Sequence, residues 1–117
     1  MTKILRVEDS LECIQVYSFI FKGYQLEISS SLADALLQIQ DNTYDIIFSD
    51  GNLWATDTTW WVIVTTKAVS KWIPVIAMSS EDDLNDMMFE AWAVEIMKKG
   101  RAHPDIVRQL IESFVQK

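Results

Sequence analysis

An apolar run of strand length that ends abruptly in an acid constrains this chain more than any other feature. The run is YDIIFS at 44–49, and Asp50 and Gly51 follow it directly. In an open parallel sheet, functional groups gather where the strands end at their carboxyl side and loops enclose a crevice. We therefore expect Asp50 to be a reactive residue, held by a rigid strand yet open to solvent and ions.

Strand-like and helix-like segments alternate along the rest of the chain. Apolar runs of strand length predict strands at 3–7, 24–29, 44–50, 73–78 and 93–97. Helical spacing of apolar residues predicts helices at 11–21, 32–39, 84–91 and 104–114. Strands that alternate with helices predict an α/β fold, a three-layer, doubly wound, five-stranded parallel sheet with helices on both faces.

The third helix of this scheme, in chain order, conflicts with its own sequence. The segment TTWWVIVTT at 58–66 is almost entirely β-branched and aromatic, and such residues individually favour strands. Two parallel strands nevertheless need a crossover connection between them, and a helix is the usual one. We therefore predict a helix at 58–66.

Several residues carry signals for helix ends. Gly23 stands where a helix ends and a positive φ is favoured. Ser31 with Asp34 resembles a capping box, and Pro104 occupies a first helical position. His103, the sole histidine, is expected to be a solvated or capping residue.

Composition excludes several classes of protein. The 117 residues predict one domain with a core that needs no disulfides, and the lone Cys13 fits a reducing compartment. A net charge of −7 argues against nucleic acid as a partner. No apolar run approaches the roughly 18 residues of a membrane helix, and the acids at Glu8 and Asp9 come too early for a signal peptide. We expect a soluble, cytoplasmic protein.

Polar residues follow successive predicted strands and should meet at one edge of the sheet. These residues are Glu8, Asp9, Asp50, Ser79 and Lys99. Three carboxylates brought together repel one another unless a cation lies among them, and hard oxygen ligands suit Mg²⁺. A lysine and a hydroxyl beside them would complete a site for a phosphoryl group.

This pattern resembles the response-regulator receiver domain of two-component signalling, of the chemotaxis-regulator type, over essentially the whole chain. The acidic pair Glu8-Asp9, Asp50, the hydroxyl of Ser79 and Lys99 occur in the family's order, and Asp57 falls where the family's loop carries an acid. The resemblance implies the flavodoxin-like strand order 2-1-3-4-5.

The resemblance also implies a mechanism. Asp50 would accept a phosphoryl group from a histidine kinase, a phosphotransfer protein or a small phosphodonor, and would lose it slowly by autodephosphorylation. Mg²⁺ would be held by the carboxylates of Asp9 and Asp50 and by the main-chain oxygen of Asn52, with Glu8 acting through water. Lys99 and Ser79 would contact the phosphoryl oxygens.

The partners follow from the same resemblance. Phosphorylation would shift the face formed by the fourth helix, fifth strand and fifth helix, which a downstream protein would bind. No output domain follows Lys117, so any effect is expected to pass through protein contacts. A monomer or a weak homodimer is expected, because any exposed tryptophans among the five at 54, 60, 61, 72 and 92 would form an apolar patch suited to dimerisation.

Five residues depart from the family pattern. Ile96 replaces the switch aromatic, and Gly100 replaces the proline after the lysine, so a trans Lys99-Gly100 bond is expected. Trp54 and Thr58 replace a loop proline and a glycine. Arg6 lies in a strand expected to be covered on both faces, where an unpaired charge is costly. These departures suggest a drifted or artificially diversified receiver.

Two other functions remain open. A non-switching receiver-fold scaffold that keeps the acidic pocket is favoured by Ile96, Gly100 and Trp54. A magnesium-dependent phosphatase with an aspartyl nucleophile is the weaker alternative, because such enzymes usually carry a second acid where Asn52 stands. They also need a substrate-covering cap, for which the chain leaves little room.

Overall fold

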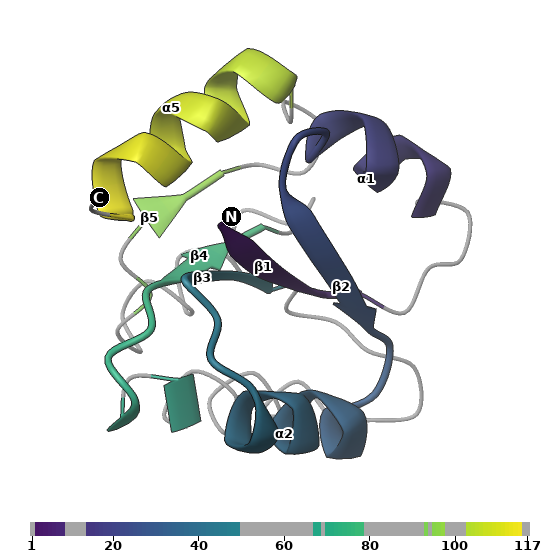
Figure 1. Ribbon diagram of the computed structural model, residues 1–117, viewed down its shortest axis with the longest axis vertical. Helices are drawn as coiled ribbons and strands as arrows, with labels where there is room; N and C mark the ends of the chain where they lie inside the picture. Colours follow the sequence, from purple (N-terminus) through teal and green to yellow (C-terminus); the bar gives the residue numbers. More distant parts are fainter. Residues whose placement is uncertain are drawn as a thin grey trace.

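A parallel sheet of five strands organises the molecule (Figure 1). The computed structural model describes residues 2–8, 14–49, 67–68, 70–78, 93, 95–97 and 103–115. The strands are β1 (Lys3–Val7), β2 (Gln25–Ser29), β3 (Ile46–Ser49), β4 (Val75–Ala77) and β5 (Glu95–Ile96), in the order β2-β1-β3-β4-β5. Every neighbouring pair is parallel. The predicted α/β class and strand order are therefore confirmed.

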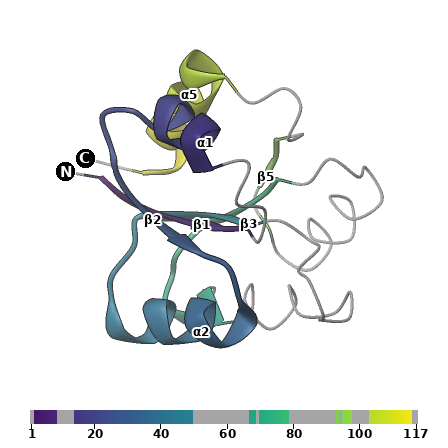
Figure 2. The ribbon, with the colours of Figure 1, turned by 90° about the vertical axis from the view of Figure 1, so that its right-hand side faces the viewer.

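Helices cover both faces of this sheet. Within the described ranges they are α1 (Ile14–Ile20), α2 (Leu32–Asp41) and α5 (Pro104–Phe114). Figure 2 shows the sheet edge-on, with α1 and α5 on one side and α2 on the other. The predicted helices at 58–66 and 84–91 lie outside the described residues, although Lys67, Ala68 and Ser70, just after the first of them, are helical.

The inner strands β1, β3 and β4 are almost entirely buried because helices cover both faces of the sheet, whereas the edge strands β2 and β5 are partly exposed. Successive side chains of a strand point to opposite sides, and Ile46 and Phe48 accordingly pack toward α1 and α5, whereas Ile47 packs toward α2. The core on the α1/α5 side consists of Ile4, Tyr17, Ile20, Phe21, Ile46, Phe48, Ile76, Met78, Met97, Val107 and Ile111. The core on the α2 side consists of Leu5, Val7, Ala35, Ile39, Tyr44, Ile47, Ala68, Ile73, Val75, Ala77 and Ala93.

The predicted helix signals are confirmed at Gly23, Ser31, His103 and Pro104, whereas the capping box is only half formed. The Ser31 hydroxyl accepts a hydrogen bond from the Asp34 amide at 3.1 Å, as an N-cap should. The Asp34 carboxylate departs from the full capping box, because it accepts a hydrogen bond from the Ser29 hydroxyl at 2.6 Å. Gly23 has a φ of 95°, and the His103 ring accepts a hydrogen bond from the Asp105 amide at the start of α5.

The predicted strands are trimmed at their ends. Tyr24 is not part of β2, because its amide bonds to Phe21 O in the turn after α1. Tyr44 and Asp45 precede β3, and the Asp45 carboxylate accepts a hydrogen bond from the Lys3 amide at 2.8 Å. No helix in the described part of the chain is long and apolar enough to cross a membrane.

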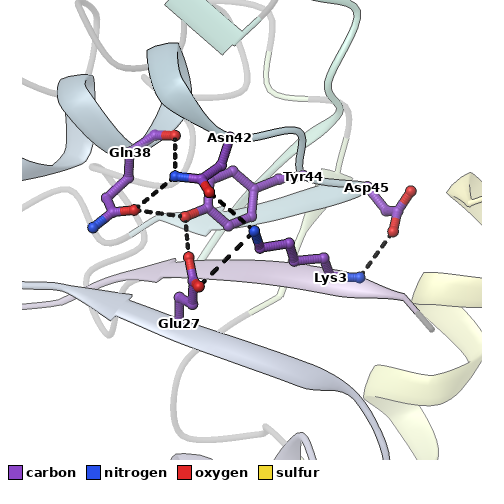
Figure 3. A network of polar contacts seen from close by, with 6 residues as sticks. All are labelled: Lys3, Glu27, Gln38, Asn42, Tyr44 and Asp45. Atoms are coloured by element: carbon purple, nitrogen blue, oxygen red, sulfur yellow. Dashed lines mark hydrogen bonds and ion pairs between the residues drawn. The ribbon is translucent and has the colours of Figure 1, made fainter.

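A polar network ties the strands to α2 where β1 begins (Figure 3). The Tyr44 hydroxyl donates a hydrogen bond to the Glu27 carboxylate, which lies 3.9 Å from the Lys3 ammonium. The Asn42 side chain joins this group through Lys3 and through Gln38, at 3.1 and 3.0 Å. Burial, and then the hydrogen bond to Glu27, raise the pKa of the Tyr44 phenol. The network lies where β1 begins, at the opposite end of the strand from Glu8.

Candidate functional site

The register of the strands brings the predicted site positions to one edge of the sheet. Val7, the last residue of β1, pairs with Ser49, the last residue of β3. Ser49 pairs in turn with Ala77, the last residue of β4, and Ala77 pairs with Ile96 of β5. Four neighbouring strands therefore end level with one another.

Backbone hydrogen bonds continue this alignment one residue past the strands. The Glu8 amide bonds to Ser29 O at 2.9 Å, the Met78 amide to Ser49 O at 2.9 Å, and the Met97 amide to Ala77 O at 2.8 Å. In the sequence, these positions are followed by Asp9, Ser79 and, after one further residue, Lys99.

Only one of the predicted site residues belongs to the described part of the chain. It is Glu8, which follows β1 and is 3% exposed. The others, and the loop acid, lie outside the described residues: Asp9, Asp50, Asn52, Asp57, Ser79 and Lys99. Their roles stay predictions.

Glu8 is held in a buried cluster with two side chains that we call the Arg6–Glu8–Tyr17 cluster. Its Oε1 accepts a hydrogen bond from Arg6 Nη2 at 2.8 Å and another from the Tyr17 hydroxyl at 2.7 Å. Arg6 Nη2 also donates to the Tyr17 hydroxyl oxygen at 3.0 Å, which closes a triangle of polar contacts. The charge of Glu8 is therefore paired with a cation inside the protein.

Arg6 is fully buried in the face of β1 that packs against α1 and α5. Its guanidinium lies over the Tyr17 ring, 4.8 Å from the centroid, a favourable cation–π arrangement. Nη1 donates to Val7 O at 2.9 Å and Phe48 O at 3.1 Å, and Nη2 donates to Met78 O at 3.3 Å. Nε, also buried, has no hydrogen-bond partner among the described residues. The sequence correctly marks Arg6 as costly if unpaired, and the structure supplies its pair.

The sequence pattern does not identify Tyr17 as a polar partner of Arg6 and Glu8, because helical spacing places it among the core residues of α1. Burial raises the pKa of its phenol well above the usual 10.0, Arg6 opposes this shift, and the hydrogen bond to Glu8 adds to it. The hydroxyl therefore stays protonated and keeps donating to Glu8. The sequence does carry a signal for the Arg6–Glu8 contact. These two residues are two apart, so their side chains share one face of an extended chain.

Oxygen donors of the predicted kind fit a hard divalent ion. The predicted set contains carboxylates and a main-chain oxygen, which are ligands that Mg²⁺ accepts. Among residues that the structure describes, no three acidic, histidine or cysteine side chains lie close enough together to hold a metal ion. Glu8, the member of this set that the structure describes, is already paired with Arg6, so its negative charge is partly compensated without a metal ion.

Ile96, which the resemblance predicts at the position of the switch aromatic, is half-buried. It packs against the α2-side core rather than presenting a ring at the surface. The predicted trans Lys99-Gly100 bond lies outside the described residues.

No protein-family model matches the sequence. A search of curated proteins finds no match either. Solved structures, in contrast, match nearly the whole chain.

Three examples show the extent of this structural similarity. The chemotaxis protein CheY4 of Vibrio cholerae has a TM-score of 0.79 at 22% identity, with 97% of this chain and 98% of that chain covered. The receiver domain of a sensor histidine kinase from Pseudomonas aeruginosa, solved with a magnesium ion in its active-site cleft, has a TM-score of 0.82 at 18% identity, with 97% of each chain covered. A two-component response regulator from Clostridium difficile has a TM-score of 0.80 at 19% identity, with 97% and 95% covered. The chain has the fold of a response-regulator receiver domain.

Proposed function

We propose that this chain is a phosphoacceptor receiver domain in which Asp50 takes a phosphoryl group from a histidine kinase or phosphotransfer protein. The observation that carries the proposal is the level ending of β1, β3, β4 and β5, which all lead into polar residues. Asp50 is the next residue after Ser49, whose strand partner Val7 is followed by Glu8. This register supports a shared site for Asp50 and the acidic pair.

The proposed reaction is a transfer between two activated phosphoryl linkages. One oxygen of the Asp50 carboxylate attacks phosphorus and forms the new O–P bond. The bond from phosphorus to the donor's histidine nitrogen, or to the oxygen of a small acyl phosphate, breaks with its electron pair going to the donor. Water later attacks phosphorus, the Asp50 O–P bond breaks with its electron pair going to the carboxylate, and inorganic phosphate and a proton are released.

The other proposed site residues position charge around this reaction. Asp9, Asp50 and the main-chain oxygen of Asn52 would hold Mg²⁺, and Glu8 would act on it through water. The bound ion would offset the negative charge that develops on the phosphoryl oxygens. Lys99 would add a positive charge beside those oxygens, and the Ser79 hydroxyl would donate a hydrogen bond to one of them. The change in charge would then alter a face around β5 and α5 that binds a downstream protein.

The direct experiment is mass spectrometry after incubation with acetyl phosphate and Mg²⁺. The parent should gain one phosphoryl group, and Asp50→Asn should gain none. Asp41→Asn, which makes the same change at an exposed residue of α2, is the matched control and should be phosphorylated like the parent. Phosphorylation of Asp50→Asn at the parent's rate would show that another residue is the acceptor.

A second candidate, a receiver-fold scaffold that does not switch, is favoured by one observation. Position 96 carries isoleucine in place of an aromatic ring that could report phosphorylation, and this side chain packs against the α2-side core. Beryllofluoride with Mg²⁺, a phosphoryl mimic, separates the two readings by NMR. Shifts that reach β5 and α5 support the switch, whereas shifts confined to the residues next to Asp50, or none, support the scaffold.

A further inference from the structure

A permanent positive charge lies beneath the edge of the sheet at which the proposed site would form. Arg6 pairs across the sheet with Phe48, which pairs with Ile76, so its side chain starts in an apolar row. From there the guanidinium donates to the main-chain oxygens of Val7, Phe48 and Met78. In the sequence, Val7 directly precedes Glu8, Phe48 comes two residues before Asp50, and Met78 directly precedes Ser79.

The guanidinium has one carboxylate partner in the described part of the chain. This is Glu8, at 2.8 Å, and both side chains are almost completely withdrawn from water. A hydrogen-bonded ion pair in such surroundings is screened little by solvent or salt. The negative charge of Glu8 is therefore compensated before any metal ion arrives.

We propose that Arg6 is a built-in countercharge that neutralises Glu8 beside the divalent-cation site and lowers the affinity of that site for Mg²⁺. This inference rests on the metal-binding part of the proposed function. The carboxylates of Asp9 and Asp50 and the main-chain oxygen of Asn52 would hold the ion, while the Arg6–Glu8–Tyr17 cluster stays intact. Arg6 is thus a positioning residue that sets the net charge of the site.

The physical reason is the balance of charge around the ion. The group contains three carboxylates with a total charge of −3, those of Glu8, Asp9 and Asp50. The Arg6 guanidinium brings the net charge of the group to −2. Each charge removed from the neighbourhood of a divalent ion weakens binding, since charges near one another in a protein interact through a dielectric well below that of water. A purely structural Arg6 would instead fill space and satisfy carbonyls without changing metal affinity.

The test is a calorimetric titration of the metal-free protein with Mg²⁺. Arg6→Met keeps a long side chain but removes the charge, and it should bind Mg²⁺ about tenfold more tightly than the parent. Arg108→Met removes the same charge from an exposed position of α5 and should match the parent. Circular dichroism verifies that each variant is folded. Equal affinity in Arg6→Met and the parent, or no binding by either, overturns the inference.

A double variant keeps the test valid if Arg6→Met does not fold. Arg6→Met with Glu8→Gln removes both charges of the pair and leaves no buried ion without a partner. If Glu8 is already compensated, the double variant binds Mg²⁺ within about threefold of the parent. If Glu8 serves the ion directly and Arg6 is inert, the double variant loses about tenfold or more, and the inference is wrong.

The outcome is separable from that of the proposed function. Phosphorylation of Asp50 with unchanged Mg²⁺ affinity in Arg6→Met would sustain the function and reject the countercharge. Tighter Mg²⁺ binding by Arg6→Met, together with no phosphorylation of the parent, would sustain the countercharge and reject the proposed function.

Discussion

At the scale of single residues, the buried tyrosines tie stability to alkaline pH. The pKa of Tyr17 is raised above its usual 10.0, mainly by burial and in part by its hydrogen bond to Glu8. Below pH 10, folded and unfolded chains both keep this proton, so the contribution to stability is fully present. Above pH 10, the unfolded chain loses the proton and the folded chain keeps it, so stability falls by about 1.4 kcal/mol per pH unit for this group.

Tyr17→Phe should therefore flatten the loss of stability above pH 10, as measured by urea unfolding at a series of pH values. At neutral pH the same change should cost about 1–3 kcal/mol, since Arg6 and Glu8 each lose a buried hydrogen-bond partner. Tyr44→Phe, on the other side of the sheet, should flatten the alkaline limb independently. A Tyr17→Phe variant with the parent's alkaline slope would contradict the prediction.

The Arg6–Glu8–Tyr17 cluster also marks the limit of what the sequence reveals at this scale. The sequence identifies Arg6 as a charge in a covered strand, and the two-residue spacing places Glu8 on the same face. It does not identify Tyr17, because that contact depends on how α1 is rotated above β1. The site's remaining residues stay predictions carried by motif order, and Glu8 is the one whose surroundings the structure defines.

At the scale of elements, prediction succeeds where the hydrophobic pattern is regular. β1 and α5 have the predicted bounds, because their ends coincide with Glu8 on one side and with His103 and Pro104 on the other. β3 and β5 are shorter than predicted, because apolar residues such as Tyr44 and Met97 are buried in the cores without belonging to a strand. Burial and strand pairing are separate properties, and the sequence pattern indicates only the first of them.

In the turn that ends at Ile73, a residue with a side chain adopts the left-handed backbone conformation, which favours glycine. The Ile73 amide bonds to Ala68 O at 3.0 Å, and both side chains are buried in the α2-side core. This is the longer of the two hydrogen bonds of a Schellman motif, in which the residue before Ile73 is left-handed. That residue is Trp72, with a φ of 63° and a side chain that is 93% exposed.

Trp72→Gly should stabilise the protein by about 0.5–1 kcal/mol. The left-handed conformation costs an L-residue about 1–2 kcal/mol, and the greater freedom of glycine in the unfolded chain returns part of that gain. Trp72→Ala is the matched control, because it removes the exposed ring but keeps the Cβ atom, and it should give little or no gain. Urea unfolding measures all three proteins, and equal stability of the alanine and glycine variants would show that the ring, not the backbone, matters.

At the scale of the whole molecule, the sheet separates two hydrophobic cores, and no side chain of the described residues belongs to both. Adjacent residues of β3 belong to different cores, since Phe48 packs toward α1 and α5 while Ile47 packs toward α2. Among the described residues, the strand backbone connects the two layers. Substitutions on opposite faces should therefore act independently, whereas substitutions within one face should be coupled.

Double-mutant cycles test this division. The Phe21 and Phe48 rings meet edge to face with centroids 5.0 Å apart, so Phe21→Leu and Phe48→Leu should show a coupling energy of about 0.5–1.5 kcal/mol. Phe21→Leu combined with Ile39→Val, which lies in the α2-side core, should be additive to within about 0.5 kcal/mol. Each free energy of unfolding comes from urea denaturation with the slope compared across variants. A coupling across the sheet as large as that within one face would mean that strain passes through the strands, so that a charge change at their carboxyl ends would reach α2 as readily as α5.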